Sequence, residues 1–88
     1  MSAVKRGDHG QAVEQLQEGL NSLGFELDVD GHFGDATHNA VITVQSIFGY
    51  TVDGVAGPAT LKLIHAQAGY GWNLVAARKA FVKGTAGA

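Results

Sequence analysis

Carboxylates are the side chains of this 88-residue chain that most readily suggest chemistry, and half of them lie close together. Glu26, Asp28 and Asp30 fall at the first, third and fifth positions of an EF-hand calcium loop when Gly31 is placed at its sixth. The twelfth position is then Thr37, where such a loop needs a bidentate glutamate. We therefore predict no calcium site, and we interpret Asp30 and Gly31 as turn formers.

The four histidines offer a second kind of chemistry, at His9, His32, His38 and His65. No two of them have the i, i+4 spacing of a zinc-peptidase helix, and the chain has no cysteine to supply a thiolate. His32 and His38 could approach each other where a loop meets a helix, with Asp30 or Asp35 beside them. We predict surface or partly buried histidines, with no metal and no cofactor.

Catalytic arrangements are also missing from the sequence. Glycoside hydrolysis needs two carboxyl groups about 5–10 Å apart across a cleft, one of them kept protonated by burial. The acids here lie in the loop described above or on the polar face of a predicted helix, at Glu14 and Glu18. Serine catalysis lacks its Gly-x-Ser-x-Gly turn. We predict that the chain is not an enzyme.

The composition indicates one small domain, with 45% hydrophobic and 16% charged residues. The longest apolar stretches, 40–44 and 74–77, are far shorter than the roughly 20 residues of a bilayer span. The first residues lack the basic-then-apolar layout of a signal peptide. All eight acidic residues lie in 1–53, and four of the six basic ones lie in 54–88, without a dense basic stripe. We predict neither a membrane nor a nucleic-acid partner.

Three helices are predicted to position these residues. The first runs from 10 to 23, because its apolar residues recur at helical spacing, and Asp8 with Gln11 could form a capping box. Gly24 is expected to end it in a left-handed conformation, and Gly19 suggests a close approach by another backbone. The second helix covers 35–48 and the third covers 58–69, beginning at Pro58. The second is expected to bury Ala40, Val41, Val44, Ile47 and Phe48.

The remaining residues form a tail in which 70–73 predicts a turn and 74–83 predicts a short fourth helix. We therefore divide the chain into a helical domain, 1–68, and a C-terminal extension, 69–88, with a flexible end from 84 onward.

An internal repeat is the most informative feature. Residues 29–37 (Val-Asp-Gly-His-Phe-Gly-Asp-Ala-Thr) align with 52–60 (Val-Asp-Gly-Val-Ala-Gly-Pro-Ala-Thr) with six of nine positions identical. In each copy Asp-Gly predicts a turn, and the second Gly predicts the N-cap of the following helix. Thr37 and Thr60 fall in the first turn, where a hydroxyl can satisfy a free backbone group. Two copies are too few for a solenoid, so the sequence predicts an all-α, compact three-helix bundle with a pseudo-repeat.

Together these motifs resemble a known family. Residues 5–25, with Lys-Arg-Gly-Asp-His-Gly at 5–10 and Leu-Gly-Phe at 23–25, resemble the opening of peptidoglycan-binding domains of the three-helix type. Residues 29–45 are similar to the family's central signature, and residues 52–61 to its closing one. Two features depart from the pattern. Val44 stands where the family often has phenylalanine, and the tail from Gln67 has no counterpart. The resemblance implies a non-catalytic three-helix module that attaches hydrolases, such as endolysins and amidases, to bacterial cell walls.

The resemblance also implies that glycan strands and stem peptides bind in a shallow surface groove. Phe33 is expected in the core, and Gln45 is expected to be a structural hydrogen bonder. The candidate ligand contacts are polar or aromatic residues near the repeat turns: Arg6, Asp30, His32, Asn39, Tyr50, Asp53 and Trp72. Arg6 could pair with a stem-peptide carboxylate, and Tyr50 or Trp72 could stack on a sugar ring.

The expected site of action is the cell wall, the periplasm or the outside of the cell. A parent chain, phage lysis or a secretion system would deliver the module there, and a linked hydrolase or an assembly protein would be its protein partner. The alternative function is a protein–protein docking module of a phage or secretion assembly.

Overall fold

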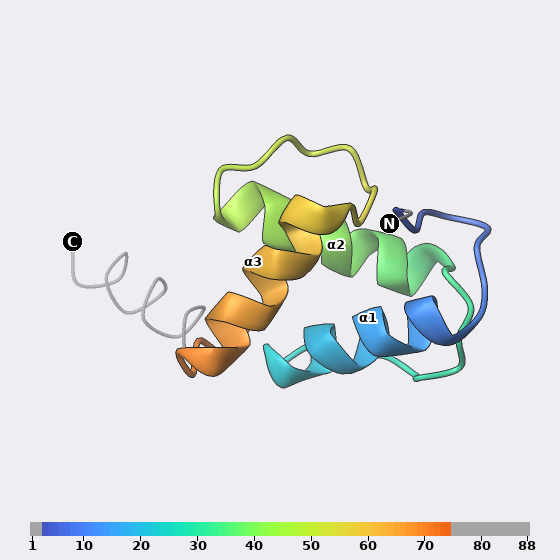
Figure 1. Ribbon diagram of the computed structural model, residues 1–88, viewed down its shortest axis with the longest axis horizontal. Helices are drawn as coiled ribbons and strands as arrows, with labels where there is room; N and C mark the ends of the chain where they lie inside the picture. The colour runs from blue at the N-terminus through green and yellow to red at the C-terminus, as the bar shows by residue number, and fades with distance from the viewer. Residues whose placement is uncertain (1–2, 75–88) are drawn as a thin grey trace, which may run out of the picture.

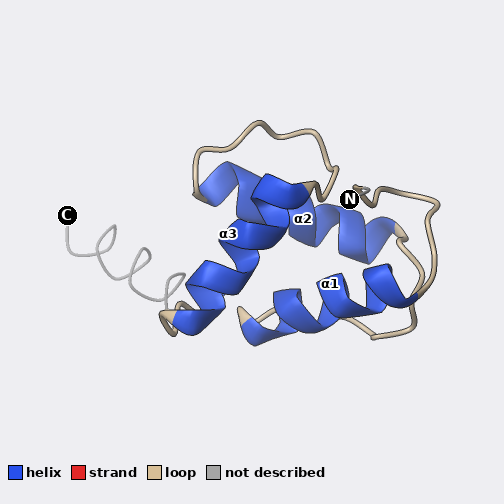
Figure 2. Ribbon diagram, viewed as in Figure 1, coloured by secondary structure: helices blue, strands red, loops and turns tan. Residues whose placement is uncertain are grey.

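The computed structural model describes residues 3–74. Within this range the chain forms three α-helices, α1 (Gln11–Ser22), α2 (Asp35–Ile47) and α3 (Pro58–Gly69), with α1 packed against both of the others (Figure 1). Long loops join the helices (Figure 2). The predicted all-α three-helix bundle is confirmed. Among the described residues, no helix is both long and apolar enough to cross a bilayer.

The predicted fourth helix, 74–83, lies outside the described residues apart from its first position. The division of the chain at residue 68 stays a prediction.

The helix boundaries agree with the sequence to within one residue, but the cap of α1 does not. Its N-cap is Gly10, with φ of +123° and no side-chain hydrogen bond. Asp8 instead accepts a hydrogen bond on Oδ2 from the Lys5 N–H at 3.0 Å, which closes a turn before the helix. The predicted capping box is therefore wrong. The reason is that residues 8 and 10 hydrogen-bond through their backbones to the loop between α1 and α2, residues 23–34, which is called the first loop. These bonds hold Asp8 away from the helix end.

The other predicted helix ends are confirmed. Gly34 and Gly57 are the N-caps of α2 and α3, both with extended backbones, and Pro58 opens α3. Gly24 follows α1 with φ of +104°, a conformation that glycine adopts without steric cost.

The core contains the apolar stripe that the sequence predicts for α1, together with Phe33, which is only 2% exposed. Ile47 is an exception, because it is 47% exposed where burial was expected. The buried stripe of α2 runs along residues 37, 40, 41, 44 and 45. At 100° per residue, Ile47 lies about 90° from the centre of this stripe, at its edge.

Gly19 lies in α1 at its crossing with α3. A Cβ atom placed there would come within 3.1 Å of Cγ2 of Ile64. The close neighbour is thus a side chain of α3 and not a backbone, which corrects the expectation. At the C-terminal end of α3, Trp72 is partly buried and meets Phe48 edge-on, with ring centroids 5.2 Å apart.

The N-terminal segment, residues 3–10, ties the two loops to the bundle. Val4 exchanges two backbone hydrogen bonds with Ala56 in the loop before α3, at 3.2 and 2.8 Å. Further along, the Phe33 N–H donates to the Asp8 carbonyl, and the Gly10 N–H donates to the Gly31 carbonyl, both at 2.9 Å. Both repeat loops therefore have a backbone partner on this segment.

Candidate functional site

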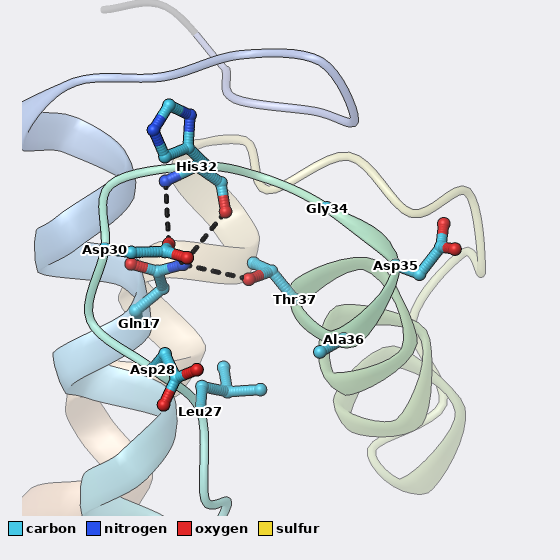
Figure 3. A pocket seen from close by; sticks show the side chains of 9 residues that line it. All are labelled: Gln17, Leu27, Asp28, Asp30, His32, Gly34, Asp35, Ala36 and Thr37. Carbon is cyan, nitrogen blue, oxygen red and sulfur yellow. Dashed lines mark hydrogen bonds between the residues drawn. The ribbon is translucent and has the colours of Figure 1, made fainter.

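The first repeat loop is built around the side chain of Gln17, which points from α1 and is 1% exposed. Its Nε2 lies within hydrogen-bond distance of three acceptors: Oδ1 of Asp30 (3.1 Å), the His32 carbonyl (3.0 Å) and Oγ1 of Thr37 (3.1 Å). Its Oε1 accepts from the Gly31 N–H at 3.0 Å. Figure 3 shows this amide inside the curve of the loop, between Asp30 and Thr37. One buried amide thus holds both the turn and the start of α2.

Asp30 closes the turn from the other side. Its Oδ1 accepts a hydrogen bond from the His32 N–H at 2.9 Å, as expected for an aspartate that forms a turn. This backbone hydrogen bond, followed by the one from Gln17, holds the pKa of Asp30 below its usual value of 3.8. The carboxylate is therefore ionised at neutral pH and partly satisfied within the loop.

The second repeat loop has the same construction around Gln45 of α2, also 1% exposed. Its Nε2 meets Oδ1 of Asp53 (3.0 Å), the Val55 carbonyl (3.0 Å) and Oγ1 of Thr60 (3.2 Å), and its Oε1 accepts from the Gly54 N–H at 3.1 Å. The Val55 N–H, and then Gln45, likewise lower the pKa of Asp53. The structural role predicted for Gln45 is confirmed.

The corresponding role of Gln17 was missed, although the sequence carries a signal for it. Residues 12–17 (Ala-Val-Glu-Gln-Leu-Gln) match 40–45 (Ala-Val-Ile-Thr-Val-Gln) in the spacing of Ala-Val and of the final glutamine. The loop after α1 is longer than the loop after α2. The two helix motifs are therefore separated by more residues than the two loop motifs. The two threonines also differ from expectation, because their hydroxyls accept from glutamine amides and not from the backbone.

A shallow cavity of about 200 Å³ opens beside the first loop. Figure 3 shows the side chains around it, with Leu27 and Asp28 below the turn and Asp35 at the start of α2. Asp30 and His32, two of the predicted ligand contacts, line it. Arg6, a third, reaches its edge through an ion pair between Nη1 and Oδ1 of Asp35 at 3.2 Å. Both partners are exposed, so the pair contributes little to stability.

The other predicted contacts are more dispersed. Asn39 is exposed on α2, one turn after Asp35, and is not among the residues that line the first cavity. Asp53 belongs to the second loop, where it forms the turn. Tyr50 is 41% exposed just after α2, and Trp72 packs at the end of α3. The structure thus brings Arg6, Asp30 and His32 to one place, and it does not gather the whole set.

The four histidines are exposed or partly buried, as predicted, but their neighbours differ from the pairing considered for His32 and His38. The ring of His38 lies against Gly54 of the second loop. His32 instead faces His9 of the N-terminal segment.

A second cavity, of about 420 Å³, lies between α1 and α3. Its lining is mostly apolar, with Leu16, Leu61 and Ile64 among its residues, and His65 at its edge is exposed. It lacks the carboxylates of the first cavity.

Comparison with known families assigns the chain to one of them. The model of the family described as "Putative peptidoglycan binding domain" matches residues 9–64, which include both repeat loops and both glutamines. The chain belongs to this peptidoglycan-binding domain family.

Individual relatives are consistent with this membership. The chain is 45% identical over 65 residues to the zinc D-Ala-D-Ala carboxypeptidase of Streptomyces albus G, covering 70% of the chain and 26% of that enzyme. It is also 45% identical over 58 residues to the N-acetylmuramoyl-L-alanine amidase CwlM of Mycobacterium tuberculosis, covering 65% of the chain and 14% of the amidase. The chain therefore spans only about a quarter or less of these relatives.

Solved structures agree on the fold. The N-terminal domain of SleB superposes with a TM-score of 0.72 at 37% identity, covering 76% of this chain and 93% of that one. The endolysin of the Burkholderia phage AP3 superposes with a TM-score of 0.69 at 38% identity, covering 72% of this chain and 24% of the endolysin.

Proposed function

We propose that this chain is a non-catalytic module that binds peptidoglycan and holds an attached or associated partner at the bacterial cell wall. The observation that carries the proposal is the family match over residues 9–64, which includes the loop with the polar cavity. Relatives named as cell-wall enzymes contain this domain as a small part of their length. Tethering a partner near its substrate raises its effective concentration there, so even a weak binding site is useful.

The proposed contact surface is the first-loop cavity and its edge. Asp28 and Asp35 are exposed carboxylates that can accept hydrogen bonds from amides of a stem peptide or hydroxyls of a sugar. His32 can contribute an imidazole at the same edge. Arg6 could exchange Asp35 for a stem-peptide carboxylate, because an exposed ion pair is weak.

The remaining candidates have secondary places in this proposal. Asp30 positions the loop. Tyr50, Asp53 and Trp72 lie on other elements, so they would contact a further part of an extended ligand. Asn39 would extend the first cavity along α2.

The test is co-sedimentation with purified, protein-free peptidoglycan sacculi. We compare the unmodified chain with a His32→Ala/Asp35→Asn double variant, because neither side chain is buried in the core. The matched control is His65→Ala, which removes an exposed imidazole beside the other cavity. We expect the double variant to weaken binding at least about tenfold, equivalent to about 1.4 kcal/mol, and the control to bind normally.

The outcomes separate function from site. Equal binding by all three proteins would support wall binding and reject the first cavity as its site. No pelleting of the unmodified chain with several wall types would refute the function. A fall in the turbidity of the sacculi would contradict the non-catalytic role.

One observation favours a second candidate function, docking within a secretion assembly. The chain is 34% identical over 85 residues to the type VI secretion system spike protein VgrG3 of Vibrio cholerae, covering 81% of the chain and 8% of that protein. A chain that fails to bind sacculi but binds a purified assembly protein would support this candidate.

A further inference from the structure

His9 and His32 lie opposite each other in a short antiparallel pairing between the N-terminal segment and the first loop. The hydrogen bonds on either side of them join Phe33 to Asp8 and Gly10 to Gly31. In this register the two histidines form a non-hydrogen-bonded pair, the kind in which Cα atoms approach to about 4.5 Å and side chains lie closest. We propose that these two imidazoles bind one divalent transition-metal ion, of the class represented by Zn²⁺.

The ring geometry is close to what such an ion requires. The two ring centroids are 6.2 Å apart and the rings are tilted by 46°. A zinc–nitrogen bond of about 2.1 Å puts each ring centre about 3.2 Å from the metal, so two tetrahedral ligands have centres about 5.2 Å apart. The rings need to approach by about 1 Å. Because both side chains are exposed, small rotations about their side-chain bonds can supply this movement.

The two imidazoles are available, whereas their backbones are fixed. Among residues 3–74, neither ring takes part in a hydrogen bond or an ion pair. The backbone of His32 is held by Gln17 at its carbonyl and by Asp30 at its N–H. Because the backbones are already fixed, binding an ion would cost only the rotamer freedom of the two rings. The nearby negative charge of Asp30 also favours a cation.

The proposed site is open. No group of three or more histidine, aspartate or glutamate side chains gathers around a common point within the described part of the chain. The ion would therefore keep water, or oxygen atoms of another molecule, at its remaining positions. Imidazole pairs favour Cu²⁺, Ni²⁺ and Zn²⁺ over Mg²⁺, which prefers oxygen ligands. The bound ion would clamp the N-terminal segment onto the first loop and so stabilise the folded state.

The test uses ZnCl₂ alone with the chain in a form that carries no polyhistidine tag. We expect isothermal titration to give one ion per chain, and thermal unfolding to shift upward. At free zinc ten times the dissociation constant, linkage gives about 1.4 kcal/mol, which raises Tm by about 5–10 °C in a domain of this size. MgCl₂ should produce no shift.

Alanine variants locate the site. His9→Ala and His32→Ala should each abolish the zinc-dependent rise in Tm, because a single imidazole is left. His65→Ala, which removes an exposed histidine of α3, should retain it. A zinc shift that survives in either His9→Ala or His32→Ala would overturn the proposal. So would an unmodified chain whose Tm is unchanged at about 1 mM zinc. Peptidoglycan is absent from the assay, so its result is independent of the proposed function.

Discussion

Replacing Gln17 by leucine tests whether one buried amide supports the whole first loop. Leucine has a similar volume but an apolar side chain, so it fills the space without the amide's hydrogen bonds. The substitution leaves the turn of Asp30, the Gly31 N–H and the Thr37 hydroxyl without the group that joins them. We therefore expect a stability loss far larger than that of an ordinary polar-to-apolar change.

The magnitude follows from which partners are buried. The Gly31 N–H and the Thr37 hydroxyl belong to buried residues, and each buried group left unpaired costs about 1–3 kcal/mol. Asp30 is exposed and can bond to water instead, so its loss contributes little. The sum is about 2–6 kcal/mol, a large share of the 5–15 kcal/mol that holds a small domain together. A domain of this size should then lose at least about 10 °C in Tm.

The measurement is urea unfolding, monitored by circular dichroism at the helical minimum. Gln15→Leu is the matched control, because Gln15 is an exposed glutamine on the same helix and undergoes the same chemical change. We expect it to alter the unfolding free energy by no more than about 0.5 kcal/mol. Gln45→Leu should destabilise as strongly as Gln17→Leu, since it holds the second loop through equivalent bonds.

A stability loss of less than about 1 kcal/mol for Gln17→Leu, the scale of one ordinary hydrogen bond, would refute the supporting role of the amide. Equal stability of Gln17→Leu and Gln15→Leu would refute it as well. A large loss for Gln17→Leu with none for Gln45→Leu would mean that the two loops are not equivalent in energy.

Two further predictions concern the loops. The pKa values of Asp30 and Asp53 are lowered in the folded state, so the stability they contribute is present above their unfolded value of 3.8 and is lost as pH falls below it. Urea unfolding from pH 6 to pH 3 should show this decline, and an Asp30→Asn/Asp53→Asn variant should show a shallower one; an unchanged slope would contradict the assignment. Gly54→Ala should lower Tm more than Gly49→Ala. Both glycines have positive φ (+73° and +74°), but only at Gly54 would the new methyl meet His38. An equal loss of Tm in the two variants would show that the contact with His38 adds nothing to the destabilisation.

Much of the fold could be predicted because it depends on local chemistry. The apolar stripe of α1 requires burial whatever covers it, and within a helix a proline such as Pro58 suits only the first turn. The glycine N-caps were also predictable, because each follows a turn motif that appears twice. The error at Ile47 arose at the end of α2, where this residue lies at the edge of the buried stripe and stays 47% exposed.

The candidate site could be predicted less well. The turn role of Asp30 is local, since its carboxylate bonds to a backbone two residues away. The partnership of Asp30 with Gln17 joins residues far apart in the chain, and so does the contact of Arg6 with Asp35. Asp8 illustrates the same limit, because its position suits a cap but a backbone pairing with the first loop competes for the segment.

The sequence by itself determined the helices, their order, the repeated turns and the family signature, because each depends on neighbours within a few residues. The tertiary structure decided which side chains meet. Only folding places Gln17 inside the first loop, aligns His9 with His32, and leaves Tyr50 and Trp72 out of the lining of the first cavity. The physical reason is that the loops take their positions from buried amides and backbone pairings that span the bundle. No local pattern specifies those partners until α1 packs against both of the other helices.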